Sequence, residues 1–439
     1  MKFSSHLGKG LWAFASRGLP SLYAIAILIA ARTLPQAEFG TLSVFQTLFT
    51  ILFTFSDGFA LQAIVKFGVE PEVTLEELVT VTTILFIAFL GSALILLLIF
   101  PRVVSVILNL PELEGLIPYL ALFALFTMPR VVFGKVLQTR FRMKEIFFVD
   151  FANFGVASIA LIVLLSSGKI RTAQEVIEVT MVTGLLSSIV AMILVRPFIQ
   201  YRIRYSRAMM SRISEFVRYQ AAMGVVSTAQ QNFDMLIVSA FTGAIGAAVY
   251  NSAKLLFRGF DVVRETMTLF VFPASSKYYS RGDLSTLRTI VEKSVGFLYL
   301  LLIPAGILLA VGSPFIYHVL YGAKYDASIP IFRVLLLAAL FFPIQMVFNV
   351  TMTGMGKIKE AFRMFLVTLL VNATLATVLL AVTHSLKGPA IAFVVGSIVQ
   401  TVQLSLYLRR EISIKPGKLW SRGIADASSY VKSRLKGAE

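Results

Sequence analysis

The segment NSAKLLFRGFDVVRE, residues 251–265, places several ionisable side chains inside a long apolar stretch of the sequence. If the segment is an α-helix, successive residues lie about 100° apart around its axis. One face of roughly 80° then collects Asn251, Lys254, Arg258, Asp261 and Glu265, with Arg264 just off its edge. Guanidinium and ammonium groups bind phosphates and carboxylates, and arginine stays charged when partly desolvated. The pattern predicts a site for an anionic group such as a phosphate, a diphosphate or an acidic sugar.

Other ionisable residues lie within the remaining apolar stretches and are candidates for the same site. The basic ones are Arg17, Arg130, Lys135 and Arg333, and the acidic ones are Asp57 and Asp234. Because the basic residues outnumber the acidic ones, we expect a cavity of net positive charge. The predicted substrate-binding residues are Arg17, Lys254, Arg258, Arg264 and Asn251. The candidates for ion coupling or for charge pairing are Asp57, Asp234, Asp261 and Glu265.

The composition indicates an all-α integral membrane protein. Of the 439 residues, 57% are hydrophobic and only 14% are charged, and the mean hydropathy is +0.82. Apolar stretches of about 20 residues, enough to cross a ~30 Å hydrocarbon core, recur along the chain and are too long for barrel strands. The chain has no cysteine and its three histidines are scattered. The sequence therefore offers no disulfide, no thiolate chemistry and no metal-ligand spacing, and no cofactor is predicted.

The apolar stretches predict about twelve membrane spans joined by short loops, none of which is long enough to form a separate soluble domain. The spans are 11–31, 39–64, 79–99, 116–138, 147–166, 176–197, 217–241, 246–272, 290–311, 329–351, 362–383 and 388–408. Breakers such as TLPQAEFG at 33–40 and TGAIG at 242–246 separate them. We interpret the first stretch as an uncleaved first helix, not as a signal peptide.

Lysine and arginine orient this array, because positively charged loops remain on the cytoplasmic side. With both termini cytoplasmic, the inner segments hold 27 basic residues and the outer loops only six. The formal net charge of +17 thus needs no nucleic-acid partner. We predict a multi-pass protein of the cell membrane, in contact with membrane lipids.

The chain also shows a weak internal repeat. A shift of 208 residues lays ILIAARTLPQAEFGTL over MLIVSAFTGAIGAAVY and Asp57 over Glu265. The repeat predicts two pseudo-symmetric six-helix lobes, residues 1–205 and 206–410, with the substrate path between them. Residues 411–439 form a basic amphipathic cytoplasmic tail, which suits either a helix on the anionic inner leaflet or a frayed solubilising tail.

A purely structural interpretation of the intramembrane charges is also open. Arg258 with Asp261, and Asp261 with Arg264, have the i, i+3 spacing of intrahelical ion pairs. Arg130 and Lys135 can extend their charged ends to the inner interface. Three residues near span ends, Asp150, Glu178 and Arg333, are interpreted as interfacial. For the charged stripe we favour a cavity, because an ionisable side chain that faced lipid would cost on the order of 3 kcal/mol.

Three segments carry a resemblance to a known family. They are HLGKGLWAFASRGLPSLYAIAILIAARTLPQAEFGTLSV at the start, FPASSKYYSRGD at 272–283 and VLYGAKYDASIPIFRVL at 319–335. Over residues 6 to 410 the chain resembles the polysaccharide/O-antigen-type flippases, the oligosaccharide branch of the multidrug/oligosaccharidyl-lipid/polysaccharide exporter superfamily. The resemblance implies a V-shaped, two-lobed exporter that works by alternating access. It also implies cationic residues in the central cavity, for which Arg17, Lys254, Arg258 and Arg264 are the matching positions.

The sequence therefore predicts a non-enzymatic flippase for cell-surface polysaccharide biosynthesis. Its partner would be a lipid-linked saccharide, implied to be polyprenyl diphosphate-linked, and polysaccharide-assembly proteins are further expected partners. One alternative is a drug/cation antiporter of the same fold, which the positive excess in the cavity disfavours. The other is a membrane-embedded glycosyltransferase or polymerase, which would need a substantial outer loop with catalytic carboxylates or arginines.

Overall fold

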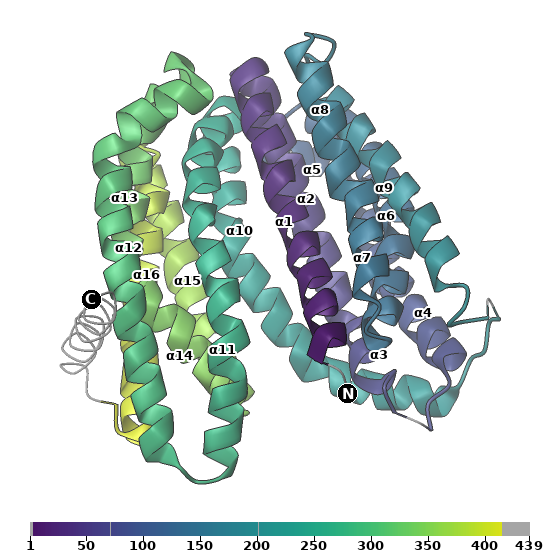
Figure 1. Ribbon diagram of the computed structural model, residues 1–439. Helices are drawn as coiled ribbons and strands as arrows, with labels where there is room; N and C mark the ends of the chain where they lie inside the picture. The colour runs from purple at the N-terminus through teal and green to yellow at the C-terminus, as the bar shows by residue number, and fades with distance from the viewer. Residues whose placement is uncertain (1–2, 71, 201, 415–439) are drawn as a thin grey trace, which may run out of the picture. The chain divides into compact units, whose positions relative to one another are not determined.

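The computed structural model describes residues 3–70, 72–200 and 202–414, which are helical with short connections (Figure 1). The predicted tail of residues 411–439 lies, from residue 415 on, outside the described residues. The chain divides into two compact units, Met1–Ala248 and Val249–Glu439, here called unit 1 and unit 2. The division of the chain into lobes at residue 205 stays a prediction.

Unit 1 contains the first nine α-helices and most of the tenth. They are α1 (Phe3–Thr33), α2 (Gln36–Phe59), α3 (Gln62–Phe67), α4 (Leu75–Ile99), α5 (Pro101–Ile107), α6 (Leu113–Thr139), α7 (Met143–Asp150), α8 (Val156–Ser166), α9 (Ala173–Val195) and α10 (Arg207–Phe257). A π-helical turn, η1 (Phe151–Gly155), joins α7 to α8.

Unit 2 begins in the last turns of α10. It continues with the 3-10 turn η2 (Arg258–Phe260), α11 (Asp261–Ser280), α12 (Leu284–Tyr321), the 3-10 turn η3 (Ala323–Ser328), α13 (Ile329–Ala338), α14 (Phe342–Gly354), α15 (Ile358–Thr383) and α16 (Lys387–Ile412).

Within the described residues, nine helices are long and apolar enough to cross a membrane. The number is ten if the bent pair of 323–338 and 342–354, whose axes differ by 50°, forms one span. The twelve predicted spans are largely helical, but four of them, 39–64, 147–166, 246–272 and 329–351, cross a junction between helices. Neither α1, which contains 11–31, nor α11, which contains the end of 246–272, is among the helices that meet this criterion of length and hydropathy. The predicted break at TGAIG is confirmed, because Gly243 interrupts α10 with a left-handed φ of 64°. The prediction of an all-helical, multi-pass membrane fold is confirmed.

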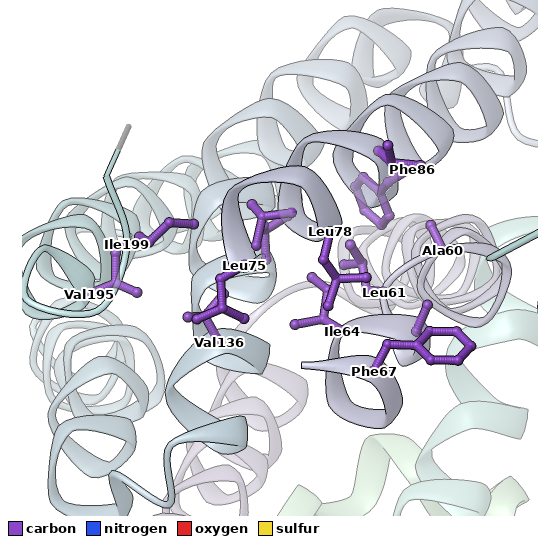
Figure 2. Packing of buried hydrophobic residues seen from close by; sticks show 14 of the residues in the cluster. Ala60, Leu61, Ile64, Phe67, Leu75, Leu78, Phe86, Val136, Val195 and Ile199 are labelled. Atoms are coloured by element: carbon purple, nitrogen blue, oxygen red, sulfur yellow. The ribbon is translucent and has the colours of Figure 1, made fainter. Parts of the chain in front are cut away.

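Unit 1 holds a closely packed apolar cluster around the corner between α2 and α3 (Figure 2). Ala60, Leu61 and Ile64 from the α2–α3 corner pack there with side chains of α4, α6 and α9, and all three are fully buried. After α9 the chain returns across this cluster, since Ile199 and Ile213 also belong to it. The cluster fixes the C-terminal ends of α2 and α6, two helices that carry charged residues within their apolar stretches.

The first turn of α2 has the sequence AEFG, residues 37–40, here called the AEFG turn, and its contacts explain the glutamate, the phenylalanine and the glycine. The carboxylate of Glu38 accepts a hydrogen bond from the backbone N–H of Ala173 and so caps the start of α9. Phe39 is fully buried. Gly40 lies so close to α10 that a β-carbon there would be 1.8 Å from the carbonyl oxygen of Ala244. These three residues therefore join α2 to α9 and α10.

Unit 2 has a buried tyrosine cluster beside the charged segment. The rings of Tyr317 and Tyr321 of α12 pack at a tilt with a centroid distance of 5.3 Å, and the ring of Tyr325 of η3 packs on Tyr321 at the same distance. The hydroxyl of Tyr321 donates to the carbonyl of Ser252, whose own hydroxyl donates to Ser328. These bonds attach the last turns of α10 to α12 and η3.

Candidate functional site

Unit 1 contains an ion pair between two consecutive antiparallel helices. Arg130 of α6 lies 3.6 Å from Asp150 at the end of α7, and both side chains are largely shielded from solvent. Ser16 of α1 donates a hydrogen bond to Asp150, and the guanidinium of Arg130 lies 4.9 Å from the centre of the Phe154 ring. Three helices thus converge on one carboxylate within the apolar part of unit 1.

Two serines of α9 position this pair through the backbone. The hydroxyl of Ser187 donates to the carbonyl of Val149, the residue before Asp150. The hydroxyl of Ser188 accepts from the backbone N–H of Arg130 and donates to the carbonyl of Phe126. Those two backbone groups would bond to each other in an uninterrupted α-helix, so Ser188 is inserted into the hydrogen-bond ladder beside Pro129.

The π-helical turn η1 follows Asp150 directly. Gly155 closes this turn, and a β-carbon at that position would lie 2.6 Å from the ring of Phe151. Single π-turns inside α-helices occur frequently at functional sites. The turn re-aims the residues that follow Asp150 and brings the ring of Phe154 to Arg130 and to Tyr23 of α1.

A second ion pair lies nearer the corner between α2 and α3. Lys135 of α6 is 3.1 Å from Asp57 of α2, and Gln62 of α3 donates to the same carboxylate at 2.7 Å. Of the two roles predicted for Asp57, charge pairing therefore has a partner in the structure. Lys135 thus contacts a carboxylate on another helix. The sequence analysis had left open that its charged end extends to the membrane interface instead.

The predicted cavity residues have unlike surroundings. Arg17 in the middle of α1 and Arg258 in η2 are exposed, and Asn251 is half-buried. Lys254 is buried, with 7% of its surface exposed. The sequence placed Lys254 and Arg258 on one continuous helical face. Because Lys254 is buried and Arg258 is exposed, the two cations do not share one environment. The 3-10 turn η2 begins at Arg258 and changes the helical phase of the residues that follow it.

The predicted acidic residues differ as well. Asp234, in the unit 1 part of α10, is buried with 3% of its surface exposed, and its carboxylate accepts the backbone N–H of Met235. The backbone of Asp261, Arg264 and Glu265 forms the start of α11, and their side chains lie outside what the structure describes. Within the described residues, no three histidine, cysteine, aspartate or glutamate side chains are grouped to hold a metal ion.

Sequence reasoning missed the convergence of Ser16, Arg130 and Asp150. It placed Asp150 at a span end, whereas α7 begins about two turns earlier, at Met143. A usable signal was present: Arg130 and Asp150 have opposite charge and lie at similar distances from the loop at 140–142, on consecutive spans. Side chains at equal depth on neighbouring antiparallel helices can form a pair. Their distances from the connecting loop can be compared from the sequence alone.

A family model described as "Polysaccharide biosynthesis protein" matches residues 29–330. The chain belongs to this family. The resemblance predicted from the three sequence segments is thereby confirmed at the level of this family. No curated protein matches the chain.

Solved structures with the same fold are transporters. An inward-facing multidrug resistance MATE family transporter of the MOP superfamily is 16% identical, with a TM-score of 0.76, covering 91% of this chain and 98% of that one. The lipid II flippase MurJ, in an inward closed conformation, is 14% identical, with a TM-score of 0.73 over 97% and 92% of the two chains. A MOP superfamily transporter from Pyrococcus furiosus, described by the reverse polarity of its binding pocket, is 16% identical, with a TM-score of 0.64 over 92% and 94%. The predicted exporter fold is confirmed.

Proposed function

We propose that this protein is a flippase that moves a lipid-linked saccharide from the inner to the outer leaflet without chemical change. The family supports a role in polysaccharide biosynthesis, and the fold is that of known exporters. Lipid-linked saccharides have a polar head that cannot cross hydrocarbon by itself and a tail that is soluble in it. A transporter for them has to provide a polar path for the head while the tail remains in the bilayer.

The exposure of Arg17 and Arg258 is the observation that carries this proposal. Each lies in a helical segment that we assign to the membrane, and neither is packed into a protein core. A guanidinium facing lipid at that depth would cost on the order of 3 kcal/mol. We therefore assign the exposed face at Arg17 in unit 1, and the exposed face at Arg258 in unit 2, each to a water-accessible surface. Each guanidinium would bind a phosphate or acidic sugar of the substrate, bidentately where the geometry allows.

The other predicted residues have supporting roles in this proposal. Lys254 is buried one helical turn before Arg258, so its positive charge would act on the ligand through the intervening protein. Asn251 and Arg264 complete the proposed cavity. Asp234, Asp261 and Glu265 remain candidates for ion coupling or for tuning these cations. Transport would proceed by alternating access, and the linking group would be a polyprenyl diphosphate.

The drug/cation antiporter is disfavoured by the sign of the exposed charges. A site for organic cations needs accessible carboxylates, whereas Asp57 is paired with Lys135 and Asp234 is buried. The fold shared with the multidrug transporter does not decide between the two, because one fold hosts many functions. Expression of the protein should therefore leave the resistance of cells to cationic dyes unchanged.

Charge reversal at Arg258 tests the flippase. Purified protein in lipid vesicles would be given a fluorescent polyprenyl diphosphate monosaccharide, and movement between leaflets followed by quenching of the outer label. We expect R258E and R17E to abolish transport, R258K to retain part of it, and R410E, at an exposed position near the end of α16, to resemble wild type. Unchanged transport by correctly inserted R258E protein would discard the cavity assignment.

A further inference from the structure

One face of α2 carries a stripe of hydrogen-bonding side chains through the apolar part of unit 1. The stripe consists of Gln46, Thr50, Thr54 and Asp57. Their spacing of four, four and three residues keeps them within an arc of about 80° and extends over roughly 16 Å of helix. Thr50 and Thr54 are exposed, while Gln46 and Asp57 are half-buried. We call these four residues the α2 stripe.

Both ends of the α2 stripe are bonded inside unit 1. The amide of Gln46 donates to the hydroxyl of Tyr23 at 3.2 Å. Asp57 pairs with Lys135 and accepts from Gln62. These contacts hold the stripe in place and leave its middle open.

The hydroxyls of Thr50 and Thr54 form no hydrogen bond with any described residue. On the buried side of the same helix, Thr47 donates to the carbonyl of Ser43 at 2.8 Å, and Ser56 donates to Leu52 in the same way. This back-bonding to residue i−4 is the usual way in which a helix satisfies a hydroxyl within an apolar environment. Thr50 and Thr54 lie on successive turns, are exposed and do not form this back-bond. Their hydroxyls are therefore suited to hydrogen bonds with water or with a polar ligand.

Arg17 lies at the depth of these two threonines. The bond from Gln46 to Tyr23 fixes the register of the antiparallel helices α1 and α2. Arg17 is six residues inward of Tyr23, and Leu52 is six residues inward of Gln46, which is about 9 Å along each helix. The guanidinium is therefore level with the middle of the α2 stripe, between Thr50 and Thr54, and all three side chains are exposed.

We infer that the α2 stripe recognises the saccharide of the substrate, with Thr50 and Thr54 bonding sugar hydroxyls while Arg17 takes the phosphate. The inference rests on the proposed function and adds the residues that distinguish a sugar-bearing lipid from a bare one. Threonine hydroxyls both donate and accept, as sugar hydroxyls do, so the two groups match without any charge. A site that bonds a hydroxyl discriminates against a ligand that lacks it, because the site's own polar groups are then left unpaired.

The absence of cysteine from the sequence allows a direct test of access. Single variants T50C and T54C would be treated, from both sides of the membrane, with a membrane-impermeant thiol reagent. The control is L125C on α6, an apolar position with 61% of its surface exposed. We expect T50C and T54C to react at least tenfold faster than L125C, and to be slowed by a polyprenyl diphosphate monosaccharide. Equal, slow labelling of all three inserted variants would place the stripe against lipid and overturn the inference.

A transport assay separates the stripe from the proposed function itself. The variant T50V/T54V keeps the side-chain shape and removes both hydroxyls, and T377V is its control, since Thr377 is exposed on α15 with its hydroxyl bonded to Ala373. For polyprenyl diphosphate carrying one hexose, we expect T50V/T54V to raise KM about fivefold to tenfold, as the loss of two hydrogen bonds allows. For polyprenyl diphosphate without sugar, KM should stay as in wild type, and T377V should change neither.

The outcomes of this assay are distinct. If T50V/T54V changes KM equally for both lipids, or for neither, the saccharide role of the α2 stripe is overturned while the flippase stands. If wild-type protein moves neither lipid, the proposed function fails and the inference falls with it.

Discussion

Replacing Gly40 by alanine tests the close approach of α2 and α10. In the structure, a β-carbon at position 40 would lie 1.8 Å from the carbonyl oxygen of Ala244 and 2.6 Å from its carbonyl carbon. Contacts of β-carbons essentially never fall below 3.0 Å. The neighbour is backbone, which cannot rotate away as a flexible side chain would. The two helices would have to separate by ~1 Å or more, and close-packed interiors resist such shifts.

The magnitude follows from two opposing terms. Alanine is a better helix former than glycine by up to about 1 kcal/mol, so the substitution by itself favours α2. Overpacking a tight contact costs typically about 1–3 kcal/mol, and more where only backbone can yield. Gly134 of α6 provides the matched control, because a β-carbon there meets nothing within 4 Å. We expect G40A to be less stable than G134A by about 2 kcal/mol.

The assay is thermal unfolding of the purified protein in detergent, read as the fraction that remains monodisperse after heating. G134A should melt at or slightly above the wild-type temperature, and G40A several degrees below it. If G40A and G134A melt together, the close approach of Gly40 to Ala244 is wrong, and the account of the AEFG turn as the joint between α2 and α10 fails with it.

The remaining predictions concern ion pairs and a helix cap. Removing one member of the Arg130–Asp150 pair, as R130Q or D150N, should destabilise unit 1 by about 3 kcal/mol, because the other charge is left without its partner. The double variant should lose less free energy of unfolding than the two single variants together, and additive losses would contradict the pairing. The pKa of Asp283 is held below its usual range by hydrogen bonds from Thr286 and Ser285, so its capping of α12 is complete above pH ~4 and is lost as the pH falls through the lowered pKa. The melting difference between wild type and D283A should accordingly shrink below that pH, and a constant difference would contradict the cap. In unit 2, Lys357 pairs with Glu411 at 2.8 Å, and Glu411 also accepts a hydrogen bond from Tyr279. K357M should lower the melting temperature more than K387M, a matched substitution at an exposed position at the start of α16.

The helices could be predicted from the sequence because their signal is local. Twenty apolar residues in a row identify a span wherever it packs, and the TGAIG breaker located the interruption of α10 at Gly243. The ends were less accurate. α12 runs from Leu284 to Tyr321, well beyond the predicted 290–311. Its C-terminal extension includes Gly312 and Pro314, residue types that often end a helix, yet the helix continues through both.

The candidate site could be predicted only in part. Residue type and depth singled out Arg17, Lys254 and Arg258, but the exposure of each depends on neighbours far away in the sequence. The extrapolation of one helical face from Asn251 to Glu265 assumed a constant 100° per residue, and η2 breaks that assumption at Arg258. The basic residues that pair with Asp57 and Asp150 both lie on α6. No periodicity within α2 or α7 encodes such a contact between helices.

The insertion of Ser188 into α6 has a mechanical consequence. A proline in a spanning helix usually leaves a soft point where the two halves can swing independently. Here the backbone groups on either side of Pro129 are tied to a hydroxyl of α9 instead of to each other. A bend at that point would break both bonds, so these contacts favour movement of α6 together with α9. Any bending that the proposed transport cycle requires would then occur at other points of the chain.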